Sequence, residues 1–154
     1  MGRGGGEPEV TWEDRVASVG LIQDRALRSL ACILVWGSDD KWDWQECFDC
    51  VVEHLASRMM AQCRTDGREA LRGGNHSLDE LCRLIARMTL HFELYNLWEL
   101  YTIKGRLAFS GINMNDRTYS NHFLKYQQAM LDELQNMVFD INQAVYKYIK
   151  DLEH

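Results

Sequence analysis

The chain has 154 residues and a net charge of −6 at pH 7, and 46% of its residues are hydrophobic. This length suits one domain with its own core, and the hydrophobic fraction argues against a disordered chain. The negative charge argues against a general nucleic-acid-binding protein, because such proteins usually present a basic surface.

The compartment and the domain limits follow from simple features. The longest apolar run, Leu30 to Trp36, is far shorter than the roughly 18 residues of a transmembrane helix. The start of the chain has no apolar signal core. Five cysteines without such a signal are typical of reduced thiols in the cytosol. We therefore expect a cytoplasmic protein without a transmembrane segment, with a disordered segment over residues 1–10 and one domain over residues 11–154.

The N-terminal half of the chain predicts two helices. The first begins at Thr11, an N-cap with Asp14 three residues on, and continues at helical spacing until Gly37 ends it. The second runs from about Trp44 to Cys63. The polar, glycine-containing stretch that follows predicts a loop with one helical turn at Glu69 to Leu71.

The C-terminal half predicts two more helices. Ser77 and Glu80 form a capping box that opens a helix reaching about Ile103, unless it breaks near Asn96. Residues 113–122 predict a loop or a weak helix start. The last helix is expected from about Tyr119 to Leu152. Its apolar face comprises Phe123, Tyr126, Met130, Leu134, Met137, Val138, Ile141, Val145, Tyr148 and Ile149. No segment shows the alternation of a strand, so the sequence predicts an all-α, single-domain helical bundle.

Cys47, Cys50 and His54 fall on one face of the second predicted helix. A zinc site there would need a fourth ligand, such as Cys63 or Cys82. Paired zinc cysteines usually stand in a tight turn, however, and cysteines on a helix face are more often part of a core. We expect neither a metal nor a cofactor.

Catalytic constellations are not indicated. The histidines are scattered without a Ser/His/Asp spacing, and Gly73-Gly74 is not followed by the Lys-Ser/Thr of a phosphate-binding loop. We expect a protein that is not an enzyme.

Two tryptophans, Trp42 and Trp44, flank Asp43 in a charged loop where burying both is difficult. Exposed tryptophan is typical of interaction surfaces. One interpretation is therefore a structural or adaptor bundle that acts through homo-oligomerisation, with these two residues at the interface.

The stretch from Glu99 to Met114 places Gly105 and Arg106 between two apolar runs. A groove that captures an amphipathic helix needs an apolar floor and a cation that pairs with an acid of the ligand, and a glycine lets the ligand backbone come close. The alternative interpretation is an ordinary helix junction, at which Gly105 kinks a helix and Arg106 extends along its surface.

The residues GRLAF, followed closely by a second glycine, resemble the first homology motif of the B-cell lymphoma 2 family of apoptosis regulators, and ELY at Glu99 to Tyr101 is similar to the turn before that motif. The segment RSLACILVWGSDD is also similar to the end of the first helix in small poxviral members. Ile103-Lys104 departs from the Asn-Trp of the motif, and neither a second Trp and Gly-Gly motif nor a tail anchor follows. Short viral members of the family tolerate such losses.

The resemblance implies a Bcl-like bundle around a central hydrophobic helix and a non-enzymatic inhibitor of apoptosis, either in the cytoplasm of a host cell or peripheral at mitochondria through its partners. Its partner would be the amphipathic death-motif helix of a pro-apoptotic protein, held in a hydrophobic groove. Homodimerisation stays open. The partner-binding residues that we expect on this basis are Arg106, for the ion pair, and Gly105, Leu100, Tyr101, Phe109 and Trp98.

Overall fold

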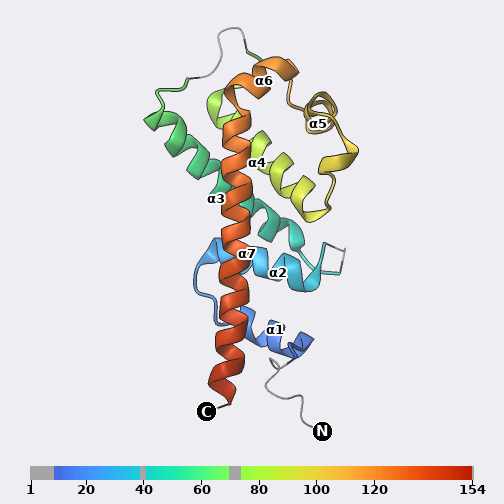
Figure 1. Cartoon of the computed structure of the whole chain (residues 1–154), viewed down its shortest axis with the longest axis vertical. Helices are drawn as coiled ribbons and strands as arrows, with labels where there is room; N and C mark the ends of the chain where they lie inside the picture. Colours follow the sequence, from blue (N-terminus) through green and yellow to red (C-terminus); the bar gives the residue numbers. More distant parts are fainter. Residues whose placement is uncertain (1–8, 39–40, 70–73, 154) are drawn as a thin grey trace.

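The computed structural model describes residues 9–38, 41–69 and 74–153, and these form an all-α bundle without strands (Figure 1). The predicted fold class, an all-α single-domain bundle, is confirmed. The described helices are α1 (Trp12–Val19), α2 (Arg25–Trp36), α3 (Trp44–Thr65), α4 (Leu78–Leu94), the 3-10 helix η1 (Trp98–Leu100), α5 (Ile103–Phe109), α6 (Asp116–His122) and α7 (Leu124–Leu152).

The first predicted helix is in fact two helices, so the prediction of one continuous helix was wrong. Its start is confirmed, because Thr11 forms a complete capping box with Asp14. The helix ends at Gly20, and α2 then begins with the Asp24 carboxylate accepting a hydrogen bond from the Leu27 backbone at 2.8 Å. Gly20 disfavours continuation of the first helix, and Asp24 stabilises the start of a new one as its N-cap. Gly37, with φ of 76°, ends α2 as predicted.

The predicted α3 is confirmed almost to the residue, and so is the N-cap of α4, where the Ser77 hydroxyl accepts a hydrogen bond from the Glu80 backbone. The longer version of α4, reaching Ile103, was wrong. The chain turns at Asn96, whose φ of 53° lies in the left-handed region that asparagine tolerates.

The last predicted helix starts later than expected. Tyr119 belongs to the separate helix α6, in the region for which a loop or weak helix start was predicted. Phe123, with φ of −123°, separates α6 from α7. The apolar face predicted for α7 is buried except for Val138, which is exposed, and Tyr148, which is half-buried.

One long helix organises the bundle. α7 runs along the molecule and packs against α1, α2, α3, α4 and α6, while α3 lies between α2 and α4 (Figure 1). The core they enclose includes Leu30, Leu55, Ile85, Phe92 and Tyr126, each at most 1% exposed. Burial of these apolar side chains is the main force that holds the helices together.

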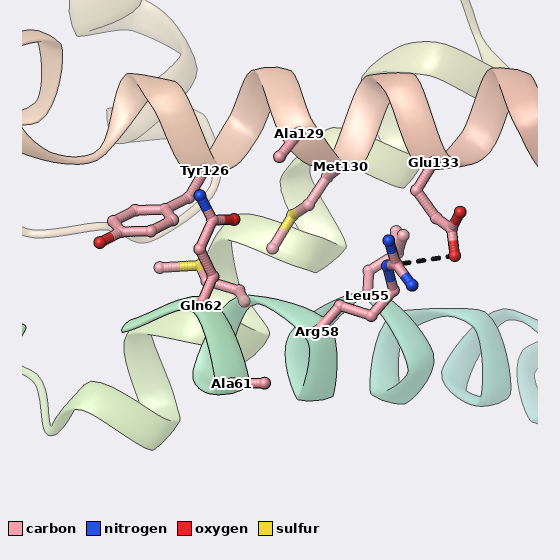
Figure 2. A pocket seen from close by; sticks show the side chains of 9 residues that line it. Leu55, Arg58, Ala61, Gln62, Tyr126, Ala129, Met130 and Glu133 are labelled. Atoms are coloured by element: carbon pink, nitrogen blue, oxygen red, sulfur yellow. Dashed lines mark ion pairs between the residues drawn. The ribbon is translucent and has the colours of Figure 1, made fainter. Parts of the chain in front are cut away.

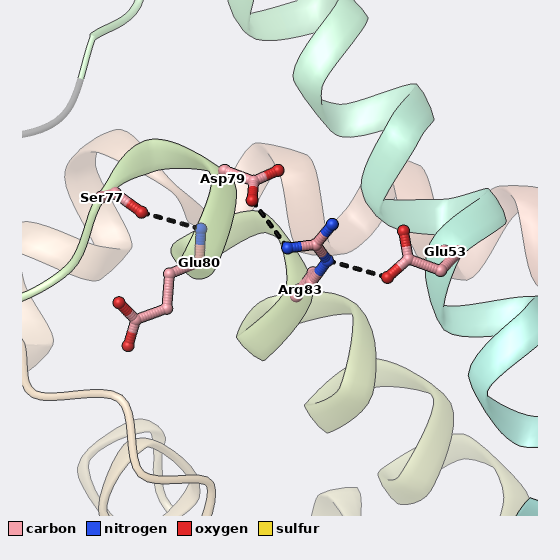
Figure 3. A network of polar contacts seen from close by, with 5 residues as sticks. All are labelled: Glu53, Ser77, Asp79, Glu80 and Arg83. Carbon is pink, nitrogen blue, oxygen red and sulfur yellow. Dashed lines mark hydrogen bonds and ion pairs between the residues drawn. The ribbon is translucent and has the colours of Figure 1, made fainter.

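A polar network joins the exposed sides of α3 and α4. The Arg83 guanidinium donates to Asp79 at 2.7 Å and to Glu53 at 2.8 Å (Figure 3). Because all three side chains are exposed to water, these ion pairs contribute little to stability.

None of the helices in the described part of the chain combines the length and the apolar character that crossing a membrane requires. The disorder predicted for residues 1–10 falls mostly on residues 1–8, and the predicted turn at Glu69 to Leu71 falls partly on residues 70–71. Both lie outside the described residues.

Candidate functional site

An aromatic cluster connects the end of α4 with η1 and α5. Its centre is Phe92, which is fully buried. The rings of Trp98 and Tyr101 lie with their centroids 5.3 Å from that of Phe92, and the ring of Phe109 lies at 5.8 Å. Three residues predicted to bind a partner are thus brought together. Phe109 remains 56% exposed, so part of the cluster faces solvent.

Arg106 extends from α5 over this cluster. Its guanidinium carbon lies 5.2 Å from the centroid of the Trp98 ring, a distance typical of a cation–π contact. Burial lowers the pKa of the Arg106 guanidinium. No carboxylate of the described residues pairs with Arg106, and its Nε is buried without a hydrogen-bond partner among them, as is Nε1 of Trp98. Two side chains in contact with each other therefore each bury one donor without a partner among the described residues.

Gly105 lies inside α5 and does not interrupt it. The helix begins at Ile103, with Thr102 as its N-cap, and the Thr102 hydroxyl accepts a hydrogen bond from the Gly105 backbone at 3.1 Å. The interpretation of Gly105 as a helix-breaking junction is therefore wrong. Leu100 stands beside this helix start and is 73% exposed.

A cleft of about 450 Å³ opens between α3, α4 and α5. Its floor is apolar and includes the buried side chains of Phe48 and Met88. Arg87 and Asp49 are exposed at its rim. The residues that line it are Trp44, Gln45, Phe48, Asp49, Arg87, Met88, His91, Phe109 and Ser110.

The rim of this cleft carries a free cation and an aromatic stack. Arg87 forms no ion pair with any described residue. The His91 ring stacks on Phe109, with centroids 5.7 Å apart and planes inclined by 24°. Burial lowers the pKa of His91, so its ring is neutral at pH 7. The cleft therefore offers an apolar surface with one cation, Arg87, and one anion, Asp49, at its rim.

Most of the cleft was not found from the sequence. Of the predicted partner-binding residues only Phe109 lines it, and Arg106 lies over the Trp98 ring. Phe48 and Met88 lie on helix faces that predict core, and nothing local distinguishes Arg87 from other surface arginines. The packing of α3 against α4 brings these residues together.

Trp42 and Trp44 are each half-buried. Nε1 of Trp42 donates to the Gly37 carbonyl at 3.0 Å, and the Trp42 ring lies 6.2 Å from that of Trp36. Trp44 packs edge-on against Phe48 and lines the cleft. Their role in self-association stays a prediction.

The helix face with Cys47, Cys50 and His54 is engaged in other contacts. Nε2 of His54 lies 2.6 Å from Oε2 of Glu133 on α7, which Arg58 also approaches at 3.2 Å. Arg58 and Glu133 border a hollow of about 290 Å³ between α3 and α7 (Figure 2). Within the described ranges, no three His, Cys, Asp or Glu side chains are grouped as metal ligands would be.

Comparison of the chain with protein-family models, with curated proteins and with solved structures gives no match in any of the three. The interpretation of the cleft and of Arg106 therefore depends on their own geometry and on the motif resemblance.

Proposed function

We propose that this protein is a non-enzymatic binding protein that holds an amphipathic helix of another protein across the cleft and the neighbouring aromatic cluster. The observation that carries this proposal is an apolar cleft that has Arg87 at its rim and shares Phe109 with the aromatic cluster beneath Arg106. Neither arginine has a carboxylate partner among the described residues. An amphipathic ligand helix supplies what is missing, because its apolar face fills a groove and its acids pair with cations at the edge.

The motif resemblance narrows the class of ligand to the death-motif helix of a pro-apoptotic protein. Sequestering that helix would inhibit apoptosis, and the bundle would then be Bcl-like. α4 would be the helix closest to the central one of that family, since it buries eight of its 17 residues, whereas α7 buries eight of 29. It also presents exposed Arg83 and Arg87 to solvent on its other face.

We expect substitutions of Arg106 and of Arg87 to weaken ligand binding by different amounts. Arg106 is partly desolvated, so we expect Arg106→Ala to weaken binding by about 1.5–3 kcal/mol, the range of a charge-assisted hydrogen bond. Arg87 is exposed at the rim, so we expect Arg87→Ala to cost less than about 1 kcal/mol. Arg83→Ala is the matched control, because Arg83 lies on the same helix but pairs with Asp79 and Glu53.

Titration calorimetry with a panel of death-motif peptides tests the proposal. We expect at least one peptide to bind the parent protein, Phe109→Glu to abolish that binding by placing a charge in the cleft, and Arg83→Ala to leave it unchanged. Circular dichroism of each variant confirms that the fold is kept. If no peptide binds the parent protein, the death-motif assignment is wrong. If peptides bind equally well to Phe109→Glu, the binding site is not the cleft.

A further inference from the structure

The outer face of α7 carries an uncharged strip about three turns long. We call it the α7 strip, and each of its residues is exposed. Phe139 is 61% exposed, Tyr146 46% and Val138 36%, although 26% of the residues in this chain are charged and could have covered such a surface. The α7 strip comprises Gln135, Val138, Phe139, Asn142, Gln143 and Tyr146.

We propose that the α7 strip docks on the α7 strip of a second copy of this chain, with the two helices antiparallel. This surface is distinct from the cleft, so the proposal does not depend on the proposed function. In an isologous dimer, a twofold axis passing between Asn142 and Gln143 would place Phe139 of each copy opposite Tyr146 of the other. Paired aromatic rings and the amides around them suit a helix contact that is only moderately apolar.

The charges beside the strip favour the second copy and also its direction. Asp140 and Lys147 are exposed on the same edge of α7, two turns apart. Antiparallel pairing places Asp140 of one copy opposite Lys147 of the other, with the two positions about 3 Å apart along the helix axis. The twofold axis produces a second, equivalent pair. Parallel pairing about a twofold axis would instead place this edge of the two copies on opposite sides of the contact, so Asp140 of one copy would not meet Lys147 of the other. Asp132 and Glu153 meet only at the outer ends of the contact, where water screens their repulsion.

Sedimentation velocity over a range of concentrations tests the contact itself. We expect the parent protein to form a dimer that dissociates on dilution in the micromolar range, because only one helix of each copy contributes. Phe139→Glu should remain monomeric at every concentration. Arg64→Glu, a change of one exposed residue on α3, is the control and should dimerise like the parent. A parent protein that stays monomeric would overturn the proposal, and so would a dimer that Phe139→Glu leaves intact.

A charge exchange tests the direction. Asp140→Lys alone should weaken the dimer at least tenfold, Lys147→Asp should do the same, and the double variant Asp140→Lys/Lys147→Asp should recover most of the loss. Failure of the double variant to recover would rule out this pairing of charges.

Crosslinking gives a second measure of direction that does not depend on affinity. Antiparallel packing brings the two copies of position 142 within about 2 Å along the axis, whereas the two copies of position 135 are about 22 Å apart. Under mild oxidation with diamide, Asn142→Cys should give a disulfide-linked dimer, and Gln135→Cys should behave like the parent chain with its own five cysteines. Equal crosslinking at both positions would indicate parallel packing and overturn the proposal.

Discussion

Arg106 illustrates how one side chain can be held without an ion pair. Its guanidinium lies over the Trp98 ring. Burial lowers the pKa of Arg106, and the neighbouring Tyr119 raises it by a smaller amount. A buried cation without a counter-charge is costly. Under the proposed function, a ligand carboxylate would remove this cost.

Tyr119 and Gln127 form the buried polar pair next to Arg106. The Tyr119 hydroxyl donates to Oε1 of Gln127 at 2.6 Å, and both side chains are at most 2% exposed. Burial raises the pKa of Tyr119, so this hydroxyl is protonated and donates at neutral pH.

We expect Tyr119→Phe to lower the free energy of unfolding by about 1–3 kcal/mol, because it leaves the Gln127 oxygen buried without its donor. Urea denaturation monitored by circular dichroism measures the change. Tyr148→Phe is the control, since Tyr148 is only half-buried on α7. Equal losses in the two variants would show that the buried hydrogen bond makes no particular contribution.

The short helix α5 contains a glycine that its backbone does not require. Gly105 has an ordinary helical conformation, and a Cβ built there would lie 3.4 Å from Thr102 Oγ1 and 3.5 Å from Tyr101 Cδ1. Gly111, two residues after α5 ends, differs because its φ of 71° is left-handed. Only the second glycine is therefore fixed by local geometry.

We expect Gly105→Ala to leave the stability unchanged or to raise it by up to about 1 kcal/mol, through better helix propensity. Gly111→Ala should lower it by about 1–2 kcal/mol, because a Cβ is disfavoured at positive φ. Thermal unfolding of the two variants makes the comparison. If Gly105→Ala is the more damaging change, Thr102 and Tyr101 cannot accommodate the added methyl group.

Helix boundaries in this chain were predicted correctly where a capping residue marks them within a few residues. They were missed where no such residue interrupts the apolar spacing. Thr11, Ser77 and Gly37 have side-chain or backbone signals that can be read within four residues, and all three were predicted correctly. The breaks at Gly20 and Phe123 interrupt apolar stripes that continue at helical spacing on both sides, so periodicity alone joined the helices.

A polar contact joins Asp66, at the end of α3, to the start of α7. Its carboxylate accepts from the Tyr126 hydroxyl at 2.8 Å and lies 3.1 Å from Lys125 Nζ. The hydrogen bond from Tyr126 and then the Lys125 ammonium lower the pKa of Asp66 below its ordinary value of 3.8. The folded state thus favours the ionised carboxylate.

A depressed pKa in the folded state gives stability that is complete above the ordinary value and is lost as the pH falls through the folded value. We therefore expect the parent to be more stable than Asp66→Asn above pH 3.8, and this difference to shrink as the pH falls further. Urea denaturation at a series of pH values measures it. Asp49→Asn controls for the loss of one exposed negative charge. A difference that is independent of pH would show that the charge of Asp66 does not matter.

The sequence by itself determined that this protein is a bundle of helices, which helix faces are buried, and that aromatic residues gather around Arg106. These properties depend on spacing of 3.6 residues and on caps within a single turn, both of which are local. The tertiary structure decided where a ligand could bind and which surface is left uncovered. The cleft joins Phe48, Met88 and Phe109 from three helices, and the α7 strip is exposed only because the other helices pack on the opposite side. Contacts between residues far apart in the chain depend on how whole helices pack, and no local pattern encodes that.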